Sequence, residues 1–249
     1  MTETEHQIPE AAARPASSRW IRLSRVAAFT VVAWSVTLQA FEGAFIPPVA
    51  VIGVVFLGLA LALRADRRRL AMVAGALAVL AVVGNLPIII DQFSHPSSMP
   101  SFVLNLVVNS AMAVILVSGL AVWRGWSAQG IRPTSFAWVG VIVVGVSVSL
   151  AASASVESAE ALSSDIQVVA QSIRFEPEAI SVEAGSVGIW VDNRDGARHT
   201  FTIRDTDHEI DLPAFSSQRA DFDLTPGTYE VICAVPGHES MSVDLTVNG

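Results

Sequence analysis

The chain has 249 residues, of which 52% are hydrophobic and only 15% are charged, and its formal net charge is −8 at pH 7. This composition excludes an ordinary soluble domain, in which about a quarter of the residues are charged. The apolar residues are concentrated in the first 152 positions, so we expect two parts of different structural class.

Five apolar runs follow one another through the first part of the chain. Each holds roughly 17–22 residues, close to the ~20 that a helix needs to cross the hydrocarbon core of a bilayer. They predict a bundle of about five transmembrane helices, at residues 21–41, 45–63, 70–90, 102–123 and 136–152.

Arginines mark alternate ends of these runs. They occur near the start of the first run, between the second and third, and between the fourth and fifth: Arg14, Arg19, Arg22, Arg25, Arg64, Arg67, Arg68, Arg69, Arg124 and Arg132. The other two connections contain none. The positive-inside rule then predicts a multi-pass protein of the cytoplasmic membrane, with a cytoplasmic N-terminus, five crossings and an extracytoplasmic C-terminal part.

Few polar side chains interrupt the apolar runs. We expect them to form hydrogen bonds between helices, and they are Gln39, Asn85, Asn105 and Asn109. A haem site is not expected, because the runs contain no histidine. His95 and Met99 share one predicted outer loop with Asp91, and they are a candidate contact for copper.

The boundaries of the parts follow from these changes of composition. We expect a cytoplasmic tail at residues 1–19, the transmembrane region at 20–152, a flexible Ser/Ala-rich linker at 153–164 and an outer domain at 165–249. Short alternating segments separated by turn residues predict a β-sandwich for the outer domain. The predicted strands are 166–169, 179–182, 187–191, 199–203, 220–224, 228–233 and 242–247.

The segment Cys233-Ala-Val-Pro-Gly-His-Glu-Ser-Met241 holds the only cysteine of the chain. A single cysteine excludes an intramolecular disulfide. A blue-copper centre binds its ion through one cysteine, two histidines and a weak axial methionine, and a loop turning at Pro236-Gly237 can supply three of these ligands. His199, at the head of a predicted strand, is the candidate for the fourth.

Three alternatives to copper stay open for these residues. Cys233 can be a buried small hydrophobe. A Cys-His-His set can bind zinc, although a structural zinc site has four strong ligands and a thioether is a poor one. A cysteine hydrolase needs a partner that orients its histidine, and the sequence marks no oxyanion hole.

The segments "FEPEAISVEAG", "HTFTI" and "PGTYEVICAVPGH…M" together resemble the cupredoxins, the family of plastocyanin, azurin, amicyanin and halocyanin. The resemblance covers residues 165–249. It implies an eight-stranded Greek-key sandwich that holds one type 1 copper ion through His199, Cys233, His238 and Met241. The two residues between His238 and Met241 make a spacing like that of amicyanin, whereas many members have a longer gap with a glycine.

A copper ion with four protein ligands has no open position for a substrate, so we expect an electron carrier and not an enzyme. The expected function is one-electron transfer on the outer face of the membrane. The expected partners are the lipid bilayer and redox proteins, such as a cationic cytochrome or an oxidase, and not nucleic acid. Copper storage or transfer, or an accessory role in a respiratory complex, are the alternatives.

Overall fold

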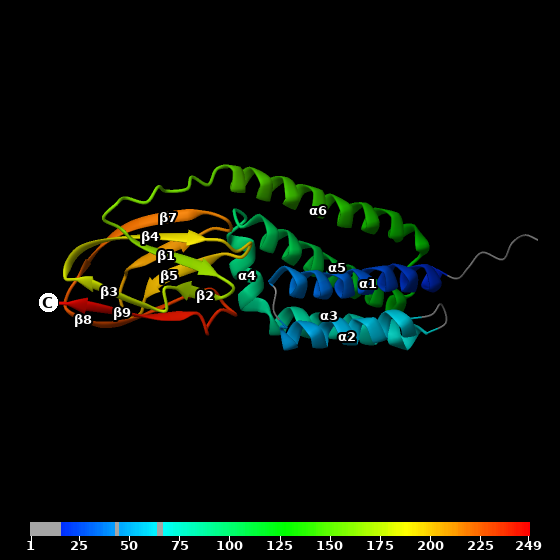
Figure 1. The fold of residues 1–249 in the computed structure, drawn as a ribbon. Coiled ribbons are helices and arrows are strands. Elements are labelled where there is room, and N and C mark those ends of the chain that lie inside the picture. The colour runs from blue at the N-terminus through cyan, green and yellow to red at the C-terminus, as the bar shows by residue number, and fades with distance from the viewer. Residues whose placement is uncertain (1–15, 43–44, 64–66) are drawn as a thin grey trace, which may run out of the picture.

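The computed structural model describes residues 16–42, 45–63 and 67–249. A helical bundle forms one half of an elongated molecule, and a β-sandwich forms the other half with the C-terminus at its far end (Figure 1). Arg14, Arg64 and most of the predicted cytoplasmic tail lie outside the described residues. The helices are α1 (Ala16–Glu42), α2 (Pro47–Ala62), α3 (Arg68–Gly84), α4 (Leu86–Ser94), α5 (Met99–Arg124), η1 (Ala128–Gly130) and α6 (Ile131–Ala154).

The described residues contain six α-helices where we predicted about five. The extra helix arises because the third apolar run is broken, and α3 and α4 meet at an angle of 67°. Pro87 follows the break at Asn85; it lacks an N–H, and its ring would clash with a preceding turn of continuous helix. The bend lays α4 across the end of the bundle, between the other helices and the sandwich (Figure 1).

By length and composition, three helical segments of the described chain can cross a membrane: Ala16–Glu42, Met99–Arg124 and Ala128–Ala154. The bent pair α3–α4 makes a fourth if it is counted as one span. The helix α2 has only 16 residues, which is shorter than the other spans. The protein therefore has several helices apolar enough for a membrane.

The helices pack closely where small residues meet. On α5, a side chain at Gly119 would come within 2.9 Å of the carbonyl oxygen of Ala71 on α3. Such close approach is characteristic of helix pairs in membranes. Among the described residues, the four polar side chains named above form no hydrogen bonds between helices, contrary to our prediction. Each donates to the carbonyl four residues earlier in its own segment: Gln39, Asn85, Asn105 and Asn109.

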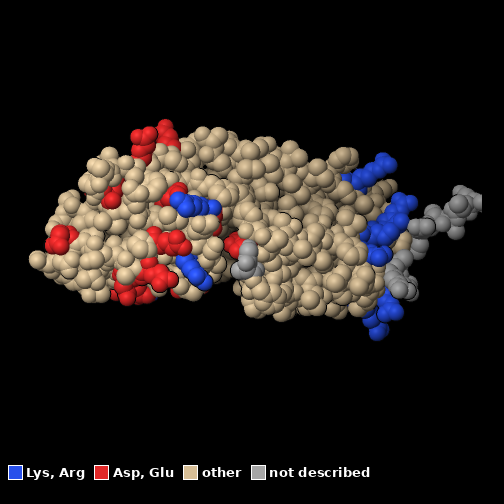
Figure 2. Space-filling view, viewed as in Figure 1, with Lys and Arg blue, Asp and Glu red and all other residues tan. Residues whose placement is uncertain are grey.

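Charge is distributed unevenly along the molecule. Arginines gather at the end of the bundle that lies away from the sandwich, whereas acidic side chains are scattered over the sandwich (Figure 2). Residues 156–249 contain 17 acidic residues and 5 arginines, which gives a formal charge of −12, and the preceding residues carry +4.

The sandwich consists of two sheets. One has the order β2-β1-β4-β7 and the other the order β3-β9-β8-β5-β6, and the pairs β1–β4 and β3–β9 are parallel. Apolar side chains of both sheets fill the space between them, among them Phe201, Ile189 and Leu245. The strands are β1 (Ile166–Gln171), β2 (Arg174–Glu176), β3 (Ala179–Glu183), β4 (Gly185–Asn193), β5 (His199–Ile203), β6 (Glu209–Leu212), β7 (Ser217–Leu224), β8 (Gly227–Ile232) and β9 (Ser242–Asn248).

The sandwich has nine strands in the described residues, two more than the seven segments that we picked out and one more than the resemblance implied. The segments missed are β2, which has three residues, and β6, which has four. β6 alternates exposed Glu209 and Asp211 with buried Ile210 and Leu212. Its exposed acids gave it the composition of a loop.

The segment between α6 and β1 follows the edge of the sandwich. Ala159 donates its backbone N–H to the carbonyl of Ser217 at 2.7 Å, and its own carbonyl accepts a hydrogen bond from the indole of Trp190, also at 2.7 Å. At its end, Asp165 accepts two hydrogen bonds from Arg219. The predicted flexible linker is thus bound along β4 and β7.

Candidate metal centre

His199 is the first residue of β5 and is completely buried. The turn that precedes it is fixed by Asn193, whose side-chain nitrogen lies 2.9 Å from the carbonyl oxygens of Ala197, Leu212 and Pro213. Because these bonds tie the turn to the end of β6, the imidazole is held at the edge of the sandwich that faces the helices.

The loop from Cys233 to Met241 folds back on itself. The amide of His238 donates to the carbonyl of Val235 at 3.0 Å, and Gly237 between them has φ +93°, a conformation that favours glycine. The amide of Cys233 donates to the carbonyl of Met241, also at 3.0 Å. The loop therefore returns its fully buried methionine to the cysteine, as the Pro-Gly turn predicted.

Three potential ligand atoms converge at this end of the sandwich. Cys233 Sγ lies 3.7 Å from the Nδ1 atoms of both His199 and His238, and the two Nδ1 atoms are 3.1 Å apart. The point equidistant from the three atoms lies about 2 Å from each, close to the length of a metal–nitrogen bond. One soft thiolate, two imidazoles and the nearby thioether of Met241 fit one type 1 copper ion.

The second nitrogen of His199 is bound by a carboxylate. Asp195 Oδ2 lies 2.9 Å from His199 Nε2, which leaves Nδ1 directed at the cysteine. Burial lowers the pKa of His199, but the hydrogen bonds with Asp195 and Cys233 outweigh it and raise that pKa to about 9. A carboxylate in this position orients a metal-binding histidine and fixes its tautomer.

The environment of Cys233 favours the thiolate. Burial raises its pKa, but hydrogen bonds from the two histidines and from the backbone amides of Thr200 and Val235 outweigh burial and lower the pKa to about 6. The amide of Thr200 lies 3.4 Å from the sulfur, and the Thr200 hydroxyl accepts a hydrogen bond from the amide of Ala234. These contacts join β5 to the cysteine loop and present the sulfur as a metal ligand.

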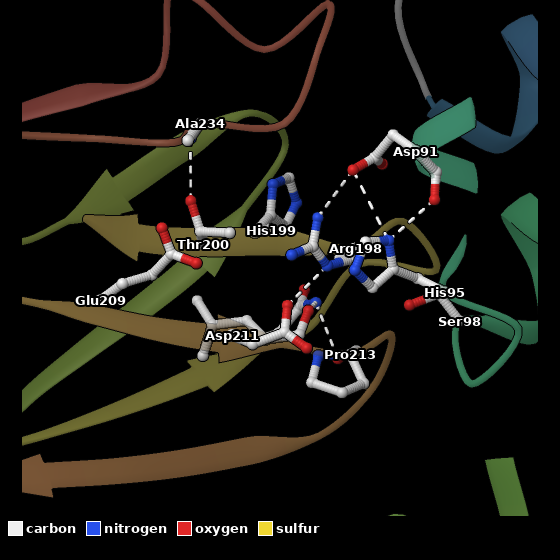
Figure 3. Close-up of polar contacts among 12 residues, drawn as sticks. Asp91, His95, Ser98, Arg198, His199, Thr200, Glu209, Asp211, Pro213 and Ala234 are labelled. Carbon is white, nitrogen blue, oxygen red and sulfur yellow. Dashed lines mark hydrogen bonds and ion pairs between the residues drawn. The ribbon is translucent and has the colours of Figure 1, made fainter. Parts of the chain in front are cut away.

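The helical bundle covers this end of the sandwich. Arg198, next to His199, forms an ion pair of 2.9 Å with Asp91 of α4 and another with Asp211 of β6 (Figure 3). Between α4 and α5, the Ser98 hydroxyl accepts the backbone N–H of Ala214. These bonds hold α4 against the loops that carry the ligands.

Apolar and acidic side chains from the helices complete this contact. The ring of Phe41, at the end of α1, occupies the space where a side chain at Gly196 would lie. The neighbouring Glu42 is close enough to interact electrostatically with His199 and His238. The ligand end of the sandwich is therefore an interface with the bundle.

The structure does not bring His95 into the cluster of His199, Cys233 and His238. His95 Nδ1 lies 2.7 Å from the carbonyl oxygen of Asp91 in its own helix. Met99 begins α5. The residues of this segment that contact the sandwich include Asp91, through Arg198, and Ser98, through the backbone N–H of Ala214.

Sequence reasoning missed three residues that position the ligands: Asn193, Asp195 and Arg198. Asp195 precedes a predicted ligand by four residues within a turn, and a carboxylate near a metal-binding histidine was the signal that could have identified it. No local signal marks Arg198, because its partner Asp91 lies more than a hundred positions away.

Comparison with known proteins gives one family match and several similar solved structures. Residues 140–247 match the family model of the cupredoxin-like domain. Amicyanin from Paracoccus versutus shares 12% identity over 36% of this chain and 86% of that chain, with a TM-score of 0.30. An amicyanin variant in its Cu(I) form shares 21% identity over 38% of this chain and 95% of that chain, with a TM-score of 0.30.

A search of curated proteins found no match. The family-model match begins within α6 and ends in β9, so it contains the whole sandwich and all four predicted ligands. The resemblance drawn from the three sequence segments is confirmed. The C-terminal part of this chain is a cupredoxin-like domain, preceded by helices apolar enough to span a membrane.

Proposed function

We propose that the protein is a membrane-anchored type 1 copper protein that transfers single electrons. The observation that carries the proposal is the triangle formed by Cys233 Sγ and the Nδ1 atoms of His199 and His238. Copper bound there would alternate between Cu(II) and Cu(I) and so carry one electron at a time. The buried loops hold the ligands in place and tune the site through hydrogen bonds to the sulfur.

Absorption and EPR spectra of the copper-loaded full-length protein in lipid nanodiscs test this proposal. We expect a blue protein with a strong thiolate-to-copper band. Cys233→Ser should remove the band and leave the fold intact, whereas Ser240→Ala, in the same loop, should retain it. A colourless wild-type protein that prefers zinc to copper would contradict the proposal.

We assign the axial position to Met241, which is buried and paired with Cys233 through the backbone. A thioether donates more electron density to copper than an alkyl group does, so Met241→Leu should keep the blue colour and raise the reduction potential. An unchanged potential and spectrum would exclude Met241 as the axial ligand.

The orientation that we propose places the arginine-rich end of the bundle in the cytoplasm and the copper domain outside. The gathering of arginines at the end away from the sandwich supports it (Figure 2). A reporter enzyme that works only outside the cytoplasm should be active when fused after Gly249. If a reporter that works only in the cytoplasm were active when fused after Gly249, the proposed orientation would be reversed.

The acidic surface of the copper domain favours a cationic redox partner, such as a basic cytochrome. Complementary charge can raise encounter rates by roughly 10–10³-fold, and salt weakens the effect because the Debye length is about 10 Å at 0.1 M. Stopped-flow oxidation of the reduced protein by a basic cytochrome should therefore slow as salt is added. A rate that does not fall would leave the acidity as a solubility feature.

A further inference from the structure

The helical bundle contains a cavity in the half that faces the copper domain. Its volume is about 120 Å³, and helices α1 to α5 all contribute to its wall. An engineered protein cavity of about 150 Å³ binds benzene, so this cavity has a size suited to a single six-membered ring. Most of the lining is apolar, which excludes a hydrated ion as its occupant.

Polar groups in the cavity wall lack partners. Trp34 contributes a buried indole N–H that has no hydrogen-bond partner among the described residues. Asn85, Asn105 and Asn109 each use one N–H to bond a backbone carbonyl, and none of their side-chain oxygens is bonded by a described residue. Because buried polar groups are normally paired, the Trp34 N–H favours a ligand that accepts a hydrogen bond, and the free oxygens of the partly buried asparagines can accept one from a ligand hydroxyl.

An apolar groove continues from the cavity along α3 and α5. The two hollows share Val82, Ile89, Asn109 and Met112, and the groove runs on over exposed Val79 and half-buried Leu116. Its lining is almost wholly apolar, as the tail of a membrane lipid requires. Together the hollows fit a molecule with a polar ring and a long apolar chain.

The side chain of Ile88 reaches from the cavity to the metal-binding loop. Ile88 of α4 lines the cavity, and its Cδ1 lies 3.8 Å from the position that a Cβ atom would take at Gly237. Gly237 is bonded directly to the ligand residue His238. The bend at Asn85 and the Asp91–Arg198 ion pair hold α4 in this position.

We propose that the cavity binds the ring of a lipid-soluble quinol, which donates electrons to the copper site past Ile88. The inference rests on the proposed function, because the copper is the electron acceptor. Oxidation of one quinol to the quinone breaks two O–H bonds and releases two protons to water on the side of the copper domain. Its two electrons would go one at a time to copper held by His199, Cys233 and His238, reducing Cu(II) to Cu(I) twice, with the redox partner reoxidising the ion after each.

Binding is tested first, with a decyl-substituted benzoquinone added to the full-length protein in quinone-free nanodiscs. The probe should quench tryptophan fluorescence with saturation, because its ring lies against Trp34. Trp34→Phe should lose the saturable component, and Trp138→Phe, which removes an indole bonded to Ser110, should keep it. Asn109→Leu, which fills the cavity and removes an amide, should weaken binding at least tenfold.

Electron donation is tested with the corresponding quinol. It should bleach the blue band of the wild-type protein and should do so at least tenfold more slowly in Asn109→Leu, whereas ascorbate should bleach both at the same rate. Quenching that only follows partition into lipid, equally in both tryptophan variants, would show that lipid chains fill the cavity and would overturn the inference.

Two mixed results separate this inference from the proposed function. A blue protein without saturable probe binding would overturn the quinol site and leave the copper function standing. A colourless protein that binds the probe at Trp34 would support the site but overturn its role as an electron donor to copper.

Discussion

The carboxylate of Asp195 determines which nitrogen of His199 is free to bind metal. It accepts from Nε2 at 2.9 Å and also from the backbone amides of Ser172 and Ile173 in the β1–β2 turn. Partners of this kind contribute about 10–100-fold to metal affinity. We therefore expect Asp195→Asn to lower copper affinity by a factor in that range, measured by competition with a copper chelator.

The matched control for this prediction is Asp192→Asn, because Asp192 lies in the same segment and bonds Arg194 and Ser217 instead. It removes the same charge without contacting a histidine. Equal copper affinity in the two variants would show that Asp195 does not position His199.

For individual residues, the sequence predicted the candidate ligand side chains of the site but not the residues that orient them. Cys233, His238 and Met241 share one loop, so their spacing alone showed that they could meet. The position of Asp195 depends on Asn193, which bonds carbonyls about 20 residues away. Side-chain direction in such a turn is fixed by distant contacts, which a local pattern does not contain.

Among the helices, the contact of α3 with α5 depends on the absence of a side chain at Gly119. A Cβ atom there would approach the Ala71 carbonyl oxygen to 2.9 Å, and backbone cannot move aside as a flexible side chain can. We expect Gly119→Ala to lower the free energy of unfolding by about 1–3 kcal/mol, as overpacking does. Thermal unfolding in detergent measures this effect.

Gly140 of α6 provides the control, because a Cβ atom there would have no neighbour within 4 Å. Gly140→Ala should leave the unfolding temperature unchanged or raise it, since alanine favours helix. A similar loss of stability in both variants would contradict the packing argument.

The junction between the linker and β1 should make stability depend on pH. The hydrogen bond from Arg219 lowers the pKa of Asp165 below its ordinary value. The unfolded chain then binds this proton at a higher pH than the folded protein, so the stabilisation is present above about pH 4 and is lost as pH falls through the folded pKa. Asp165→Asn should lower the unfolding temperature at pH 7 and flatten its decline in acid.

Thermal unfolding between neutral and acid pH measures the Asp165 effect, and Asp223→Asn, at an exposed position of β7, is the control. If Asp165→Asn retained the full acid dependence of the wild type, other carboxylates would account for it.

Elements with a clear hydrophobic period were predicted well, and those without one were not. The apolar runs correspond to helices, and alternation identified strands such as β3 and β9. β6 was missed because exposed acids alternate with its two buried residues. The break between α3 and α4 was missed because hydropathy stays high across it, although Pro87 was a visible signal.

In the whole molecule, the bundle covers the end of the sandwich that holds the candidate ligands. The Asp91–Arg198 ion pair joins the two parts, and both side chains are largely buried. We expect Asp91→Asn to loosen this contact and to increase several-fold the rate at which a soluble basic cytochrome oxidises the copper. Stopped-flow absorbance at a fixed salt concentration measures the rate.

Glu178→Gln removes one negative charge from an exposed side chain that forms no ion pair among the described residues, so it controls for the loss of electrostatic attraction. If the cytochrome oxidised the copper equally fast in Asp91→Asn and in this control, the Asp91–Arg198 contact would not limit access of the cytochrome to the copper. The contact itself was not predicted, because residues 91 and 198 are distant in the sequence and each alone resembles an ordinary surface charge.

The hydrogen bonds along the segment between α6 and β1 affect how partners find the copper. A free tether of a dozen residues would let the domain sweep a volume of solution and carry its electron to a distant acceptor. Hydrogen bonds involving Ser217, Trp190 and Arg219 instead fix the segment along the sandwich, so a metal ion at the candidate site would stay at a constant distance from the helical bundle. In the orientation proposed above, a redox partner would therefore have to come to the membrane surface to exchange electrons with the copper.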